Sequence, residues 1–242
     1  MGQLIDAIAE LFGIVLSYVY TIIPNFGISI IILTVLVKLI TFPLNNKQIQ
    51  SAKKMQELQP EIKRIQTKYK HDKEKQNKAM AELLQQHNVN PMAGCLPLLI
   101  QFPILVGMFR LLSQADKFIK IEFNSFLIPA WEFIDLLHIE KFNAAYLLNP
   151  ESLAYYMFPL IAGITTFIYQ KQTLGDTNQK LMLYMMPVLI VYFSFNFPTG
   201  LVLYWILNNL FSMGQHYVMN YMKGIKGKSP EDKGEKGDKQ QK

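Results

Sequence analysis

The sequence has little cysteine and few charged residues, and both shortages limit the classes of protein to which it can belong. The single cysteine, Cys95, excludes an intramolecular disulfide framework, and its small apolar neighbours favour a packing role. Charged residues make up only 17% of the 242 residues, whereas soluble domains average about 25%. Half of the residues are hydrophobic, and they gather into long blocks. This composition is typical of an integral membrane protein.

Signatures of catalysis are also missing. The sequence contains no H-E-x-x-H, G-x-S-x-G or Walker pattern. None of the predicted spans contains Asp or Glu, so neither a paired-aspartate protease nor a carboxylate proton relay is predicted. The sequence therefore predicts neither an enzyme nor a metal or cofactor site. The four histidines are far apart and lack the spacing of metal ligands: His71, His87, His138 and His216.

Five apolar segments predict an all-α bundle of transmembrane helices. Several are shorter than the roughly 20 residues that a standard bilayer requires, and three contain proline. We therefore expect kinked spans and a locally thinned bilayer. The predicted spans cover about residues 26–41, 95–112, 155–170, 181–197 and 201–219.

Basic residues gather on one side of these spans. Nineteen of the 24 Lys and Arg residues fall in 47–94, in 171–180 or in the tail after Met219. The segments on the other side, 1–25 and 113–154, contain three basic residues in all. The positive-inside rule therefore predicts a multi-pass protein with its N-terminus outside and its C-terminus in the cytosol.

The first 25 residues have an amphipathic pattern. An apolar stripe at helical spacing is opposed by small and acidic residues. The pattern favours a helix that lies in the extracellular-side interface, and a sixth span is the alternative. The apolar stripe consists of Leu4, Ile8, Leu11, Val15, Val19 and Ile22, and the opposite face of Asp6, Glu10, Gly13 and Ser17.

Residues 47–90 predict a cytosolic helical hairpin. Apolar residues recur every three or four positions on both sides of the polar turn Lys70–Asp72, and Pro60 is expected to kink or restart the first helix. Ten basic residues against five acidic ones in 47–94 fit either a solvated face or contact with anionic lipid or ribosomal RNA. Residues 220–242 predict a basic disordered tail.

Lys38 is the most informative residue, because it is a cation near the middle of the first span. On insertion scales, a lysine at the centre of a membrane helix costs roughly 2.5 to 3.5 kcal/mol. Thr34, Thr41 and Asn45 share its helix face. This polar stripe favours a groove that contains water, and a lysine that extends to the interface is the alternative.

Uncharged polar residues in the second and fifth spans extend the candidate groove. Hydrogen bonds between helices explain any one of them. Polar stripes on two spans together with a cation instead favour one shared hydrophilic cavity. The candidate groove residues are Lys38, Thr34, Thr41, Gln101, Tyr204, Trp205, Asn208 and Ser212.

Three blocks of sequence occur in a specific order. They are LVKLITFPLNNKQ running into MQELQPEI, then NVNPMAGCLPLLIQFPIL, then MMPVLIVYFSFNFPTGLVLYWILNNL. Together they resemble the YidC/Oxa/Alb membrane protein insertases over about residues 26–219, in the short bacterial form without the large periplasmic domain. The resemblance implies a bacterial cell (plasma) membrane and a five-helix bundle. Its hydrophilic groove opens to the cytosol and the lipid and is closed outside.

The resemblance also implies a function. Nascent membrane proteins would move from the cytosol into the lipid bilayer without nucleotide hydrolysis, with the ribosome and the Sec translocon as expected partners. The family's groove arginine falls on Lys38, which keeps the charge but loses the forked guanidinium geometry. Two other classes of function remain as alternatives. A small anion transporter or channel would typically show paired repeats or a pore, and a structural assembly factor would need no hydrated lysine.

Overall fold

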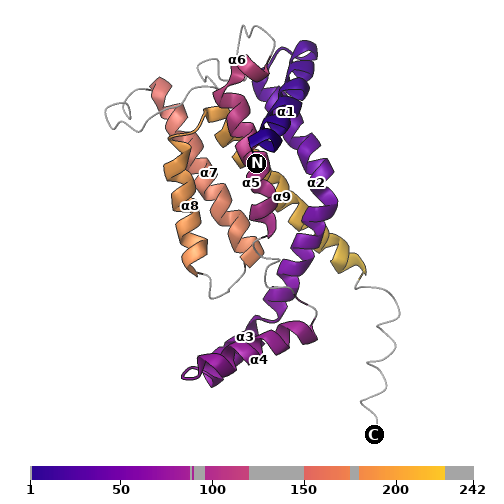
Figure 1. Cartoon of the computed structure of the whole chain (residues 1–242), viewed down its shortest axis with the longest axis vertical. Coiled ribbons are helices and arrows are strands. Elements are labelled where there is room, and N and C mark those ends of the chain that lie inside the picture. The colour runs from indigo at the N-terminus through magenta and orange to yellow at the C-terminus, as the bar shows by residue number, and fades with distance from the viewer. Residues whose placement is uncertain (1, 88, 90–95, 120–149, 175–179, 227–242) are drawn as a thin grey trace.

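Every regular element in the described part of the chain is a helix, which agrees with the predicted all-α class. The computed structural model describes residues 2–87, 89, 96–119, 150–174 and 180–226. The helices, labelled in Figure 1, are α1 (Gly2–Ile22), α2 (Phe26–Glu57), α3 (Gln59–Lys68), α4 (Lys73–Gln86), α5 (Leu96–Ser113), α6 (Ala115–Phe118), α7 (Pro150–Leu174), α8 (Lys180–Ser194) and α9 (Thr199–Lys226).

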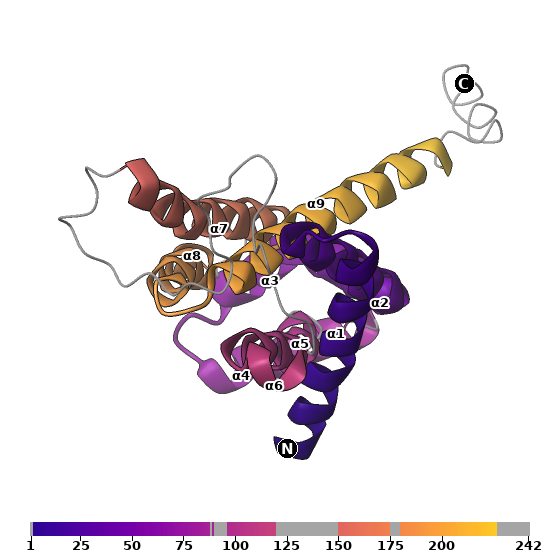
Figure 2. The same cartoon turned by 90° about the horizontal axis from the view of Figure 1, so that it is seen from above.

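The long helices pack into one bundle. α7 contacts α8 and α9, α9 also contacts α2 and α5, and α1 contacts α5 and α2. Figure 2, which views the bundle from above, shows α7 and α8 on one side and α1 and α2 on the other. The predicted spans fall within α2, α5, α7, α8 and α9, and the crossing of the membrane by all five stays a prediction. Fully buried core residues include Leu16, Phe26, Met108, Leu111, Leu201 and Tyr204.

The outside of the bundle is apolar as well. Leu39 and Ile40 on α2 and Leu181, Val188 and Tyr192 on α8 are all largely exposed. A soluble monomer rarely exposes so much contiguous apolar surface, whereas a membrane protein presents it to lipid. Within the described residues, α1 and α2 are long and apolar enough to cross a bilayer, and 101–113 and 183–194 are shorter apolar helices.

The α2 helix begins at a side-chain cap and extends well beyond the predicted first span. The Asn25 side-chain oxygen accepts a hydrogen bond from the Ile28 amide at 3.0 Å, which satisfies one of the free amides of the first turn. Prediction placed the end of the span near Thr41, but α2 continues through Pro43 to Glu57. Residues 47–57 therefore belong to α2 and not to the hairpin. They contain no glycine or proline and are mostly good helix formers, which explains the continuation.

The α1 helix packs closely at small residues and also through part of its apolar stripe, because Ile8 and Val15 contact the core. A Cβ on Gly13 would overlap the carbonyl oxygen of Phe118, and one on Gly107 would come within 2.6 Å of the Ile8 Cγ2. Close approach of helices requires small side chains at the crossing. The buried face comprises Ala9, Phe12, Gly13, Leu16 and Tyr20, whereas Leu4, Leu11 and Ile22 are exposed.

The α3–α4 hairpin has a small core of its own. Pro60 lies in the first turn of α3, where its missing amide costs nothing, and this agrees with the predicted restart. The Asp72 side chain caps α4, and the hydrogen bond from the Lys75 amide holds the pKa of the Asp72 carboxyl below its ordinary value. The cap is therefore fully charged at neutral pH. The buried core consists of Leu58, Ile62, Leu83, Leu84 and Val89.

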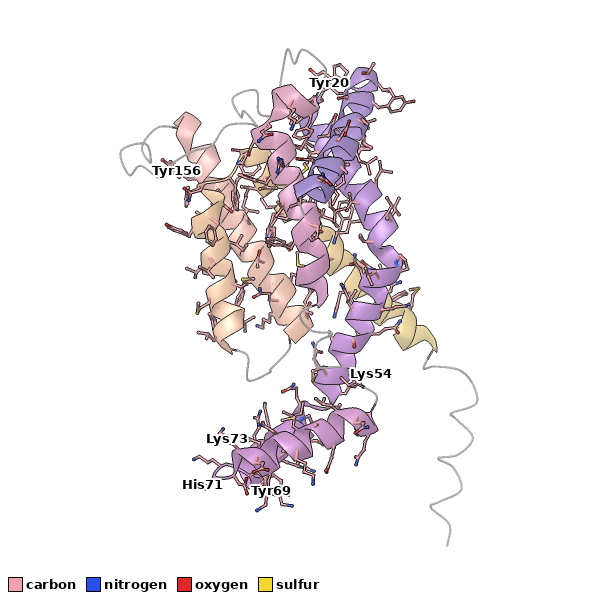
Figure 3. The ribbon with its side chains drawn as sticks, in the orientation of Figure 1. Tyr20, Lys54, Tyr69, His71, Lys73 and Tyr156 are labelled. Atoms are coloured by element: carbon pink, nitrogen blue, oxygen red, sulfur yellow. The ribbon has the colours of Figure 1, made fainter. Side chains whose placement is uncertain are left out.

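The hairpin lies at the opposite end of the bundle from the α1–α2 turn. Figure 3 shows Tyr69, His71 and Lys73 at the tip of the hairpin, far from Tyr20 and Tyr156 at the other end. One contact at its base joins α2 to α7: the Gln56 Nε2 donates to the carbonyl oxygens of residues 172 and 173, at 3.1 and 2.7 Å. These carbonyls belong to the last turn of α7 and have no partner within their helix.

The C-terminal tail begins later than predicted. Residues 220–226 are helical as the last turns of α9, because the disordered composition starts only at the Gly-Lys-Ser-Pro sequence that follows Lys226. Most of the predicted tail, 227–242, lies outside the described residues, as does 120–149 of the predicted external segment.

Candidate functional site

Lys38 extends from α2 toward α9 and binds a neutral partner. Its Nζ donates a hydrogen bond to the Ser212 Oγ at 2.7 Å, and the residue is half-buried. Among the described residues no carboxylate lies within ion-pair distance of this ammonium group. A buried cation is usually paired with an anion, because a single hydroxyl replaces little of its hydration. The positive charge of Lys38 is therefore only partly compensated by the protein.

The Ser212 hydroxyl fixes the position of that ammonium group. It donates to the Asn208 carbonyl oxygen at 2.8 Å, so its only proton is used within α9. It accepts from the Lys38 Nζ, and the Tyr169 phenol of α7 is a further hydrogen-bond neighbour. Lys38 thus uses one of its three N–H groups on this hydroxyl. The other two are available to an anionic or carbonyl ligand.

A second polar contact joins α2 and α9 on the hairpin side of Lys38. The Gln215 Nε2 donates to the Asn46 Oδ1 at 2.6 Å and lies 3.4 Å from the Phe42 carbonyl oxygen. The Thr41 hydroxyl donates to its own helix at 2.8 Å and accepts from the Asn45 amide at 3.3 Å. A polar seam therefore runs from Lys38 toward the end of the bundle where the hairpin lies.

Two predicted groove residues are buried in this structure. The Tyr204 side chain is 1% exposed, and its phenol accepts a hydrogen bond from the Gln101 Nε2 of α5 at 3.0 Å. Thr34 has no exposed surface, and its hydroxyl donates to the Ile30 carbonyl oxygen one turn earlier. Gln101 and Tyr204 connect α5 to α9 behind the Lys38 site.

Trp205 faces α7 and not the Lys38 site. Its indole Nε1 donates to the Thr166 Oγ1 at 2.9 Å. The Asn209 amide is hydrogen-bonded to the same hydroxyl and to that of Thr165, at 3.0 and 3.3 Å. We call these four residues, Thr165, Thr166, Trp205 and Asn209, the α7–α9 clasp. Two features of the sequence could have indicated the clasp. Thr165 and Thr166 are adjacent in one apolar span, and Trp205 and Asn209 lie four residues apart, on one helix face, in another.

The structure therefore divides the predicted set into three groups, apart from Thr34, whose hydroxyl bonds within α2. Lys38, Asn208 and Ser212 meet where α2 crosses α9, with Thr41 one turn away. Gln101 and Tyr204 pair with each other, and Trp205 belongs to the clasp. Sequence reasoning did not assign Asn46, Tyr169 or Gln215 to the site, although Gln215 continues the periodicity of the α9 stripe.

Comparison with known proteins identifies the family. The family model described as 60Kd inner membrane protein matches residues 18–226, which includes α2 to α9. The chain belongs to this family. The matched range contains all the residues around Lys38 that are described above.

Curated relatives share a functional name. The membrane protein insertase YidC of Syntrophus aciditrophicus (strain SB) is 39% identical over 207 residues, which cover 85% of this chain and 35% of the relative. The membrane protein insertase MisCA of Bacillus subtilis (strain 168) is 36% identical over 228 residues, which cover 90% of this chain and 76% of the relative. The chain thus spans about a third of the length of the YidC relatives that it matches.

A solved structure has the same fold. A crystal structure of an active YidC insertase, with its first transmembrane domain resolved, matches with a TM-score of 0.66 and 26% identity. The match covers 89% of this chain and 46% of that one. Together with the relatives, it establishes that the chain is a membrane protein of the insertase family.

The clasp generates a stability prediction. Thr166→Val keeps the shape of the side chain but leaves the part-buried Trp205 indole and the buried Asn209 amide without their shared hydroxyl, which costs about 1–3 kcal/mol. We expect a lower midpoint of thermal unfolding for the detergent-solubilised chain. Thr21→Val is the matched control, because the exposed Thr21 hydroxyl bonds only to its own helix. Equal midpoints for the two variants would show that the clasp adds no stability.

Proposed function

We propose that this chain is a membrane protein insertase and chaperone, which moves nascent membrane proteins from the cytosol into the lipid bilayer. The names of its relatives support this activity. The observation that supports it most directly is Lys38, a cation in an apolar helix with only a neutral partner. Such a charge destabilises the protein unless it interacts with water or with a passing ligand.

Lys38 acts on the polar end of a substrate. A short, often acidic tail would be expensive to move through hydrocarbon, because its charges and backbone groups would lose their hydrogen bonds. The two remaining N–H groups of Lys38 and the neighbouring polar side chains replace water for that tail. The substrate's apolar segment then moves sideways into lipid, and its removal from water supplies the free energy. No nucleotide hydrolysis is needed.

The groove for this reaction lies where α2, α5 and α9 meet. Lys38, Asn208 and Ser212 form its centre, and the Asn46–Gln215 contact marks its approach from the hairpin end. With the N-terminus outside, a substrate carboxylate moves outward past Lys38. A membrane potential that is positive outside favours this movement by roughly 2.3 kcal/mol per charge per 100 mV.

The hairpin and the tail recruit partners in the cytosol. The ten basic residues in 47–94 and the seven after Met219 give this side of the protein a positive field. Ribosomal RNA and anionic lipid are both attracted by such a field. We propose the translating ribosome as the main partner, with the Sec translocon as a second one beside the bundle.

Substitution of Lys38 tests the proposed mechanism. Lys38→Arg keeps the charge and should keep insertion of an acidic-tailed substrate into proteoliposomes. Lys38→Met removes an interaction of about 1.5–3 kcal/mol with a carboxylate, which should slow insertion by roughly tenfold to a hundredfold. Lys47→Met on the exposed part of α2 is the matched control and should insert at the normal rate. Normal insertion by Lys38→Met would contradict the electrostatic role.

Charge substitutions in the hairpin test recruitment. Lys63→Gln, Arg64→Gln and Lys70→Gln together remove three exposed positive charges without touching the hairpin core. We expect weaker ribosome co-sedimentation and a smaller dependence on salt. The control replaces three acidic residues instead, Glu61→Gln, Glu74→Gln and Glu82→Gln, and should bind at least as well as the unmodified chain. If both triple variants sediment alike, the hairpin does not recruit ribosomes by charge.

A further inference from the structure

A pocket at the end of the bundle opposite the hairpin is separate from the Lys38 site. It has a volume of about 390 Å³, at the small end of the range for ligand sites, and lies between α1 and α6. Figure 1 shows α6 beyond the end of α5, so the pocket lies where the apolar helix 101–113 gives way to polar chain. A pocket at this level faces the headgroup region of the bilayer. Its lining comprises Asp6, Glu10, Ile14, Ser17, Lys117 and Phe118.

Both signs of charge are present in this pocket. Asp6 forms an ion pair with Arg110 of α5, so its charge is already neutralised. Glu10 and Lys117 are exposed, and among the described residues neither has an ion-pair partner. The Lys117 ammonium lies 4.9 Å from the centroid of the Phe118 ring. The pocket thus has one unpaired anion and one unpaired cation.

Exposed apolar side chains lie beside these charges on α1. Ile14 forms part of the pocket and is 60% exposed, and Leu11 and Tyr18 lie on the same exposed face of α1 at helical spacing. A ligand that fits this arrangement has two opposite charges a few ångströms apart and an apolar chain attached. Those are the features of a phospholipid with a zwitterionic headgroup.

We propose that the α1–α6 pocket binds the headgroup of phosphatidylethanolamine from the outer leaflet. The Lys117 ammonium and the Ser17 hydroxyl donate to the phosphate, and the Glu10 carboxylate accepts from the primary ammonium group. An acyl chain lies along Leu11, Ile14 and Tyr18. The site is independent of the proposed insertase function, because it lies between α1 and α6 and shares no residue with the Lys38 site.

The Glu10 contact makes the site selective. Phosphatidylethanolamine has an ammonium group with three N–H donors, whereas the quaternary ammonium of phosphatidylcholine has none. A charge-assisted hydrogen bond is about twice as strong as a neutral one. We therefore expect a preference of about tenfold for phosphatidylethanolamine over phosphatidylcholine with the same acyl chains. Phosphatidylglycerol lacks the ammonium group, so Glu10 repels it.

Native mass spectrometry of the full chain in detergent tests the site. The chain is mixed with equal amounts of phosphatidylethanolamine, phosphatidylcholine and phosphatidylglycerol of matched acyl chains. The unmodified chain should retain the first lipid about tenfold more than the second. Glu10→Gln should abolish that preference, and Lys117→Gln should weaken the binding of both zwitterionic lipids equally. Glu61→Gln and Lys63→Gln, which make the same changes on the distant hairpin, should alter nothing.

Two results would overturn the proposal. Equal retention of phosphatidylethanolamine and phosphatidylcholine by the unmodified chain would show that no headgroup selectivity exists. A preference for phosphatidylglycerol that is lost only in Lys117→Gln would show a site for a simple anion. Insertion activity enters neither comparison, so the outcome is separate from that of the Lys38 substitutions.

Discussion

The hydrogen bond between the Lys38 ammonium group and the Ser212 hydroxyl is the contact on which the rest of the functional structure depends. It joins α2 to α9 across 174 residues of sequence and holds a cation inside an apolar bundle. A carboxylate in place of the serine would neutralise the positive charge of Lys38, and little attraction for an anionic substrate would remain. A valine in its place would leave the ammonium group without any partner. The hydroxyl positions the charge while neutralising little of it.

The surrounding helices make that arrangement stable. The α7–α9 clasp fixes α9 against α7, and the Tyr169 phenol reaches from α7 to the same Ser212 hydroxyl. Gln101 and Tyr204 hold α5 against α9 on the far side. Each of these polar groups bonds to another helix, so little of their hydrogen-bonding capacity remains for a ligand. Lys38 differs from all of them because its capacity exceeds what its partner accepts.

The sequence was sufficient to identify Lys38 but not to separate groove residues from core residues. A charge in an apolar run is a local signal, and helical spacing grouped Lys38 with Thr41 and Asn208 with Ser212, whose roles as groove residues stay predictions. Tyr204 shows the same spacing and yet is buried, because the rotation of α9 about its axis is set by packing with α5 and α7. Trp205 faces α7 for the same reason.

The α1 and α2 helices show that the sequence pattern also predicts the fold only in part. The apolar stripe of α1 only partly faces the protein: Ile8 and Val15 pack against the core, whereas Leu4, Leu11 and Ile22 are exposed. In a membrane, small residues permit close helix packing and large apolar residues are equally stable in lipid. The α2 helix continues past the predicted first span and through Pro43, because a proline inside a membrane helix commonly kinks it without ending it.

The most direct test of the central claim is whether water reaches residue 38, and from which side. Lys38→Cys in a Cys95→Ser background gives a chain with one thiol, which a membrane-impermeant maleimide labels only where water has access. The account predicts labelling in inside-out vesicles, where the cytosolic face is exposed, and none in right-side-out vesicles. A thiol that reacts from neither side, yet reacts fully after denaturation, would mean that Lys38 lies in a dry bundle and would contradict the account. Labelling from both sides would indicate a channel.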